Sequence, residues 1–120
     1  MSKKVLVAED YTDSRKMLRT LLELNGFDVL EAADGYEAVE KAVEEHPDLI
    51  LMDIAMPTLD GVQATSVIRQ HDSLAETPIL CITAYGDYYG QRAREAGCNT
   101  VLSKPIDIQK LTPLVQQYLA

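Results

Sequence analysis

Three carboxylates, one hydroxyl and one ammonium follow short apolar runs in this sequence, a combination suited to phosphoryl chemistry. The side chains are those of Glu9, Asp10, Asp53, Thr83 and Lys104. Two carboxylates about 4 Å apart repel each other by about 4 kcal/mol at an effective dielectric of about 20. A hard divalent cation removes that cost, and Mg²⁺ suits a site with few carboxylates and several water positions.

The same set suits transfer of a phosphoryl group to a carboxylate. Asp53 would attack phosphorus in line and form an acyl phosphate, while Mg²⁺ and the Lys104 ammonium neutralise the transferring oxygens. The Thr83 hydroxyl would donate a hydrogen bond to another of these oxygens. Each residue alone has an ordinary interpretation, for example an acidic helix start at Glu9 and Asp10. Only the combination predicts a site.

Five short apolar runs have to position these residues. They are, in chain order, residues 5–8, 29–32, 49–52, 79–83 and 100–103. The first, third and fourth lack polar alternation, as strands buried on both faces of a parallel sheet do. Stretches of helical spacing separate the runs, which predicts a parallel sheet with helices on both faces. Ligands bind such sheets beyond the carboxyl ends of the strands, where the polar residues stand.

Residues that start and stop helices agree with this division. Gly26 and Gly97 stand where two helices should end, just before the turn into the next strand. Asp34 and Glu37 resemble a capping box at a helix start. The second run ends in two alanines, as an edge strand without a site residue would.

The last helix is ambiguous. It is expected from about residue 108 to 119 and contains Pro113. A proline there either kinks the helix or delays its start, in which case Thr112 becomes the N-cap. The sequence leaves both arrangements open.

Composition and charge narrow the class of protein. The 120 residues include 11 basic and 19 acidic side chains, a formal net charge of -8, and 47% are hydrophobic. These values suit one globular domain, predicted over residues 1–120 with no output domain. The acidic balance argues against nucleic acid or anionic lipid as direct partners. No apolar run approaches the roughly 18 residues of a membrane-spanning helix, and the start carries no secretory signal.

Motifs for other kinds of site are missing from the sequence. Neither G-x-x-x-x-G-K-[ST] nor G-x-G-x-x-G follows the first strand, and the acidic turn at residues 9–13 would repel a bare phosphate. Nucleotide and flavin mononucleotide binding are therefore disfavoured. Cys81 and Cys98 stand in unrelated contexts without zinc spacing, which predicts two reduced thiols in a cytoplasmic protein.

At these residues the chain resembles the receiver domain of bacterial two-component response regulators, and in particular stand-alone regulators of the chemotaxis type. The matching segments are Val5-Leu6-Val7-Ala8-Glu9-Asp10, Leu51-Met52-Asp53-Ile54-Ala55-Met56-Pro57, Asp60-Gly61, Ile82-Thr83-Ala84 and Ser103-Lys104-Pro105. The resemblance spans essentially the whole chain. It implies a flavodoxin-like (βα)5 fold, a doubly wound α/β architecture with a five-stranded parallel sheet in the order 2-1-3-4-5.

The resemblance also implies a reaction. Asp53 would accept a phosphoryl group from a phosphohistidine of a sensor kinase or a histidine phosphotransfer protein. Thr83 and Lys104 match the residues that contact the bound group. The peptide bond between Lys104 and Pro105 is expected to be cis.

Metal binding and docking are implied in the same way. Glu9 and Asp10 match the family's acidic pair, and the Ala55 backbone carbonyl matches the remaining protein ligand of Mg²⁺ beside Asp53. The upstream partner would dock on the first helix, near Ser14 and Met17. Methionine suits an adaptable contact, although a surface methionine without a role is equally expected.

Two departures from the family pattern bear on switching. Val101 occupies the place of the usual aromatic residue on the fifth strand and has no ring to swing inward. Coupling from Asp53 to the surface formed by the fourth helix, fifth strand and fifth helix is therefore expected to be weak or to use other residues. Ala55 and Tyr85 occupy the two positions that tune dephosphorylation in the family. Ala55 has no polar atom to align water and Tyr85 would shield phosphorus, which predicts slow dephosphorylation.

Three functions are compatible with these residues to different degrees. The first is a phosphorylation-dependent switch that acts on an unidentified downstream protein, as a monomer or weak dimer. The second is an aspartyl phosphatase, disfavoured because Ala55 stands where such enzymes place a general acid. The third is a phosphorylation-independent interaction module, which Val101 favours and the intact acidic site disfavours. The prediction is the switch, catalysing only its own phosphorylation and slow dephosphorylation.

Overall fold

Five parallel strands form a single sheet in the order β2-β1-β3-β4-β5. The computed structural model describes residues 2–84 and 87–120. The strands are β1 (Lys4–Ala8), β2 (Asp28–Ala32), β3 (Leu49–Asp53), β4 (Ile79–Thr83) and β5 (Thr100–Ser103). The apolar runs therefore predicted every strand to within one residue at each end, and the expected strand order is confirmed.

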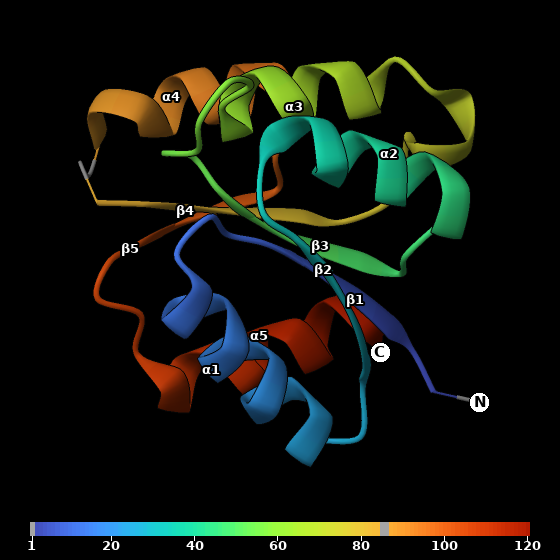
Figure 1. Ribbon diagram of the computed structural model, residues 1–120, viewed down its shortest axis with the longest axis vertical. Helices are drawn as coiled ribbons and strands as arrows, with labels where there is room; N and C mark the ends of the chain where they lie inside the picture. Colours follow the sequence, from blue (N-terminus) through green and yellow to red (C-terminus); the bar gives the residue numbers. More distant parts are fainter. Residues whose placement is uncertain (1, 85–86) are drawn as a thin grey trace.

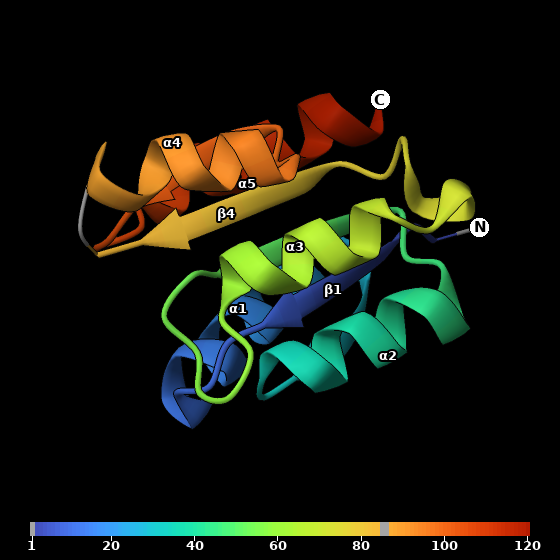
Figure 2. The same cartoon turned by 90° about the horizontal axis from the view of Figure 1, so that it is seen from above.

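Helices cover both faces of the sheet, as predicted (Figure 1). One face carries α1 (Thr12–Leu24) and α5 (Ile108–Leu119), and the other carries α2 (Gly35–Glu45), α3 (Gly61–Arg69) and α4 (Asp87–Ala96). Figure 2 shows α3 lying between α2 and α4. A 3-10 turn, Asp72–Leu74, precedes β4. Among the described residues, none of the helices combines the length and apolar character needed to cross a membrane.

The core consists of two apolar layers, one on each side of the sheet. Strand β1 supplies both: Val5 and Val7 pack toward α1 and α5, and Leu6 and Ala8 pack toward α2, α3 and α4. All five residues of β3 and all five of β4 are buried. Each large aliphatic side chain removed from water contributes on the order of 1.5–3 kcal/mol, so the central strands hold the carboxyl-end residues in place.

Local capping explains where α2 and α3 begin. Asp34 accepts a hydrogen bond from the backbone N–H of Glu37 at 2.8 Å, which confirms that half of the predicted capping box. A complete box occurs at α3, where Asp60 and Gln63 exchange both bonds at 2.8 and 3.2 Å. This box anchors the loop that follows β3, next to the candidate site.

The structure decides between the two arrangements of the last helix. α5 runs Ile108–Leu119 with Pro113 inside it, and Asp107 caps its start by accepting from the N–H of Gln109 at 3.0 Å. Thr112 is therefore not the N-cap. In the part of the chain that the structure describes, its buried hydroxyl oxygen has no hydrogen-bond partner.

The two cysteines lie closer together than their sequence contexts indicate. The sequence placed Cys81 and Cys98 in unrelated contexts, but both lie in the core layer beneath α3 and α4, and their thiols interact. Contact with Cys98, together with burial, raises the pKa of Cys81, whereas contact with Cys81 lowers the pKa of Cys98. Both are free thiols. Cys81 pairs with Val101 of β5, and Cys98 precedes that strand, so the contact arises where the connection between α4 and β5 packs against β4; the linear spacing does not show it.

Candidate functional site

The carboxyl ends of β1 and β3 bring three carboxylates together. One carboxylate oxygen from each of Glu9, Asp10 and Asp53 lies within 4.8 Å of the others. Glu9 and Asp53 are buried, at 3% and 2% exposure, and Asp10 is exposed. β1 and β3 are neighbours where the chain reverses its order in the sheet, the usual ligand position in parallel sheets.

One ammonium group faces these carboxylates. The Nζ of Lys104 donates to Asp53 Oδ2 at 3.1 Å and to Glu9 Oε1 at 3.4 Å. Burial lowers the pKa of Lys104, but the two carboxylates outweigh burial and raise it. Burial, followed by contact with Asp53, raises the pKa of Glu9, and burial and contact with Glu9 raise the pKa of Asp10. The site therefore carries more negative charge than Lys104 alone can balance.

The donor set fits a hard divalent cation. Buried carboxylates without enough counter-charge are costly, and oxygen donors in such a cluster are the ligands that Mg²⁺ prefers. The backbone of Ala55 also lies beside this cluster, since its N–H donates to Asp53 Oδ1 at 3.2 Å. The sequence predicted this grouping of acidic residues.

Strands β4 and β5 bring the remaining predicted residues to the same edge of the sheet. Thr83 ends β4 and is buried, and β4 pairs with β3 so that Ile82 lies opposite Asp53. The backbone N–H of Lys104 donates to the carbonyl of Thr83 at 2.9 Å, which places the lysine just beyond β5. The bond between Lys104 and Pro105 is cis, as expected from the resemblance.

Comparison with known proteins decides the family. The profile of the response regulator receiver domain matches residues 5–116. This chain belongs to the response regulator receiver domain family. The polar-differentiation response regulator DivK of Brucella ovis is 35% identical over 122 residues, which cover 99% of this chain and 98% of that protein.

Solved structures of receiver domains superpose closely on this one. Chemotaxis protein CheY4 of Vibrio cholerae has a TM-score of 0.92 at 30% identity, covering 98% of this chain and 99% of that one. The receiver domain of sensor histidine kinase PA1611 of Pseudomonas aeruginosa also has a TM-score of 0.92, at 31% identity, covering 99% of this chain and 98% of that one. The latter structure has a magnesium ion coordinated in its active site cleft.

A groove adjoins the acidic site of this receiver domain. Ser14 and Met17, the two residues expected at a docking surface, both line a cavity of about 590 Å³ that Glu9 and Lys104 also border. Its wall is completed by Leu18, Pro105, Ile106 and Ile108. Met17 is 46% exposed. The groove thus presents apolar side chains next to Glu9 and Lys104 of the acidic site.

Two of the three residues expected to tune the receiver domain, Ala55 and Val101, lie in the described part of the chain. Ala55 is exposed, and Tyr85 lies outside the described residues. Val101 is half-buried in the apolar layer beneath α4. If Gly90 of α4 carried a Cβ atom, that atom would lie 3.8 Å from Cγ1 of Val101. Helix α4 therefore approaches β5 closely at Val101.

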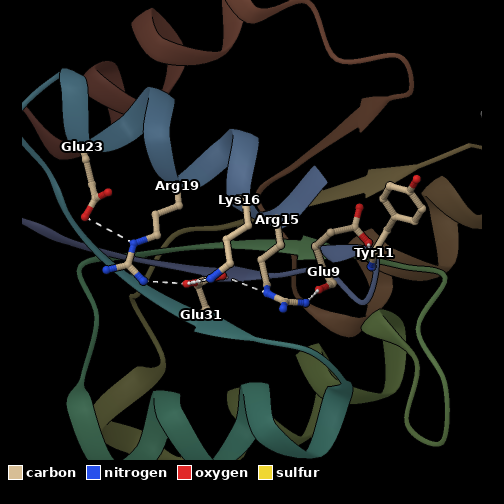
Figure 3. A network of polar contacts seen from close by, with 7 residues as sticks. All are labelled: Glu9, Tyr11, Arg15, Lys16, Arg19, Glu23 and Glu31. Atoms are coloured by element: carbon tan, nitrogen blue, oxygen red, sulfur yellow. Dashed lines mark hydrogen bonds and ion pairs between the residues drawn. The ribbon is translucent and has the colours of Figure 1, made fainter. Parts of the chain in front are cut away.

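Sequence reasoning missed the residues that hold Glu9. Arg15 in α1 donates from Nη1 to the backbone oxygen of Glu9 and from Nε to Oε1 of Glu31, both at 2.9 Å (Figure 3). The two alanines at the end of β2 predict no site residue on that strand. A usable signal was present: Glu31 is a charge within an apolar strand, and Arg15 and Arg19 are basic residues one helical turn apart.

Proposed function

We propose that this receiver domain is a phosphorylation-dependent switch in which Asp53 accepts a phosphoryl group from a phosphohistidine. The donor is a sensor histidine kinase or a histidine phosphotransfer protein. One observation carries the proposal: the buried Asp53 carboxylate lies beside the Lys104 ammonium and two further carboxylates at the strand ends. That arrangement suits a nucleophile and the charge of a phosphoryl group together.

The residues divide the reaction among them. A carboxylate oxygen of Asp53 attacks phosphorus, the P–N bond to the donor's imidazole breaks, and that imidazole leaves with its electron pair and takes up a proton. Lys104 pairs with one phosphoryl oxygen, and the Thr83 hydroxyl donates to another. The product is an acyl phosphate on Asp53.

Mg²⁺ belongs to the same proposal. Glu9, Asp10, Asp53 and the carbonyl of Ala55 would hold it, and it would supply charge neutralisation for the phosphoryl oxygens. The excess carboxylate charge described above supports this choice. Ser14 and Met17 would contact the upstream partner, because their groove borders the site.

Switching follows from the added charge. A phosphoryl group brings about two negative charges to a site whose one ammonium, among the described residues, already serves two carboxylates. We expect the new charge to draw Lys104 and Thr83 toward it and to alter the surface at β4 and β5. Ala55, Tyr85 and Val101 remain the residues proposed to set the lifetime of the phosphoryl group and the strength of this coupling.

The proposal treats residues 1–120 as one receiver domain, monomeric or weakly dimeric, that acts on a downstream protein. It includes no enzymatic activity beyond the protein's own phosphorylation and slow dephosphorylation. A cytoplasmic location goes with it, since Cys81 and Cys98 are buried thiols of the kind that reducing compartments preserve.

Intact-protein mass spectrometry tests the proposal. The protein is incubated with Mg²⁺ and a small acyl phosphate, beside Asp53→Asn as the matched control. We expect one added phosphoryl group in the wild type, abolished by a chelator and absent from the variant. An adduct that persists in Asp53→Asn would show that another residue accepts the phosphoryl group.

A second function, a phosphorylation-independent interaction module, is favoured by Val101 alone. Val101 has no aromatic ring that could move when the site is phosphorylated, and α4 packs against Val101 at Gly90. A folded protein that binds Mg²⁺ yet takes up no phosphoryl group would support this alternative and contradict the switch.

A further inference from the structure

The backbone of Glu9 is held on both sides by the edge strand β2. Its N–H donates to the carbonyl of Ala32 at 3.0 Å. Its carbonyl accepts from Arg15, whose guanidinium is in turn bound to Glu31. Glu31 and Ala32 are consecutive residues, so β2 holds Glu9 once directly and once through Arg15. Figure 3 shows the second of these connections. Arg15 therefore joins the carboxylate of Glu31 to the backbone of Glu9, a residue of the acidic site.

The anion that holds Arg15 is itself firmly placed. The side chains of Arg15 and Glu31 are only 14% and 15% exposed. Glu31 also accepts hydrogen bonds from Lys16 and Arg19. Burial raises the pKa of Glu31, but the three basic residues outweigh burial and lower it to about 2. Arg15 therefore lies against a carboxylate with little freedom to move.

The contact with Glu9 matters because of peptide geometry. The carbonyl of Glu9 and the N–H of Asp10 belong to one planar unit, so the direction of that carbonyl also sets the backbone of Asp10. A donor that fixes the orientation of this carbonyl therefore also restrains the Cα atoms from which the Glu9 and Asp10 side chains extend. The Glu9 carboxylate is further oriented by the N–H of Tyr11, which donates to Oε2 at 3.2 Å.

We infer that Arg15, clamped by Glu31, is a positioning residue that holds Glu9 and Asp10 in the arrangement that binds a divalent cation. The inference rests on the proposed function, because it concerns the same acidic site. It extends that site to a helix and an edge strand that contribute no ligand.

Electrostatics and positioning make opposite predictions for Arg15. The guanidinium is a positive charge near the site, so by Coulomb repulsion alone its removal would strengthen Mg²⁺ binding. As a positioning residue its removal weakens Mg²⁺ binding, because the Glu9–Asp10 peptide loses its anchor. Loss of a partner that orients a metal ligand typically costs 10–100-fold in metal affinity. The sign of the change therefore identifies the role.

The experiment is calorimetric titration of the full chain with Mg²⁺. Arg15→Met is compared with Arg19→Met, a matched control that removes a positive charge from the same Glu31 but, in the described network, does not contact Glu9. We expect Arg15→Met to bind about tenfold more weakly than wild type. Arg19→Met should bind as tightly as wild type or slightly more tightly.

Arg15→Lys separates charge from geometry. It keeps the positive charge, but a single ammonium cannot reproduce the guanidinium fork that joins Glu31 to the Glu9 carbonyl. We expect it to lose most of the affinity that Arg15→Met loses, and it serves as the test variant if Arg15→Met does not fold. Phosphorylation by a small acyl phosphate gives a second readout: saturating Mg²⁺ should restore the wild-type rate in both variants, whereas general damage to the fold would lower the rate at every Mg²⁺ concentration.

The outcomes separate this inference from the proposed function. Wild-type Mg²⁺ binding with unchanged or tighter binding in Arg15→Met overturns the positioning role alone. Mg²⁺ binding without phosphorylation in the wild type overturns the switch, while the comparison of affinities still decides the role of Arg15. No Mg²⁺ binding in the wild type overturns both.

Discussion

Two arginine networks tie helices to opposite edges of the sheet, and they differ in chemistry and in place. At the β2 edge, Arg15 and Arg19 of α1 bind the carboxylate of Glu31. At the β5 edge, Arg69 ends α3 and binds neutral acceptors. These are the carbonyls of Gly97 at 2.9 Å and Leu74 at 2.7 Å, and Oδ1 of Asn99 at 2.9 Å.

The position of each network along the strands determines what it can influence. Glu31 lies near the carboxyl end of β2, where the acidic site is built, and its partner Arg15 contacts Glu9 directly. Asn99 directly precedes β5, at the amino end of that strand, and its Oδ1 also accepts from the N–H of Ile79 at 2.9 Å, where β4 begins. The first network therefore serves both stability and the site, whereas the second serves stability.

The acceptors determine how each network responds to solution conditions. An ion pair depends on the charge of its carboxylate and is screened by salt, whereas hydrogen bonds from a guanidinium to carbonyl groups change little with either. We therefore expect low pH and high salt to weaken the ion pairs at the β2 edge and to leave the hydrogen bonds of Arg69 at the β5 edge nearly unchanged.

The largest effect on stability is expected at the β5 edge. Arg69→Met removes the charge-assisted hydrogen bonds to Gly97, Leu74 and Asn99 and takes from the Gly97 carbonyl its guanidinium donor, which should lower the free energy of unfolding by about 3 kcal/mol. Urea denaturation measures the loss, which should be unchanged by 1 M NaCl. Mg²⁺ affinity should equal that of the wild type. A loss that fades in salt would contradict the distinction between the two edges.

A smaller and pH-dependent effect is expected at the β2 edge. The pKa of Glu31 falls from its ordinary 4.5 to about 2 in the fold. Its contribution to stability is therefore complete above pH 4.5 and is lost as the pH falls from there toward 2. Because Lys16 and Arg19 are partly exposed and screened, we expect Glu31→Gln to cost about 2 kcal/mol at neutral pH.

Denaturation of wild type and Glu31→Gln at several pH values checks this prediction. The two proteins should differ most at neutral pH and low salt, and their stabilities should converge below pH 4.5. A constant difference across the acid range would show that Glu31 acts through packing rather than charge.

Glu9, whose backbone is bonded to β2 and to Arg15, should affect stability with the opposite sign to Glu31. Burial and Asp53 raise the pKa of Glu9, so its ionised form costs stability, and the cost is absent below pH 4.5 and complete above the raised pKa. In a chelator at neutral pH, Glu9→Gln should stabilise the protein by about 1 kcal/mol, or raise Tm by about 4 °C. Added Mg²⁺ should reverse the order by stabilising the wild type more. Thermal melts with and without Mg²⁺ check this, and a destabilised variant in chelator would contradict the picture of excess negative charge.

The smallest effect is expected at the exposed end of the β2 network. The Lys16 side chain is 58% exposed, although its Nζ lies 3.1 Å from Glu31. Exposed ion pairs contribute little, so Lys16→Met should change the free energy of unfolding by less than about 0.5 kcal/mol. A loss as large as that of Glu31→Gln in urea denaturation would mean that Lys16, rather than Arg15, holds the carboxylate.

Much of the fold and most of the site could be predicted from local patterns. The central strands follow from apolar runs, because segments buried on both faces of a sheet are predominantly apolar. Glu9, Asp53 and Lys104 follow from their places after those runs, because parallel strands end at one edge. These inferences need only chain order and the handedness of the connections.

What escaped prediction depends on side chains that meet across elements. The reach of Arg15 from a helix to Glu31 on an edge strand, and back to the Glu9 carbonyl, has no marker in the sequence beyond charge. The contact of Cys81 with Cys98 depends on how the connection between α4 and β5 packs against β4. Pro113 could begin a helix or lie inside one, and the capping bond of Asp107 decided the matter.

The sequence by itself determined which residues can do chemistry and on which edge of the sheet they stand, because burial dictates the apolar runs and the runs dictate the ends. Only the tertiary structure decided how those residues are held. The direction of a carbonyl and the reach of a guanidinium depend on distances between elements, which side-chain packing sets.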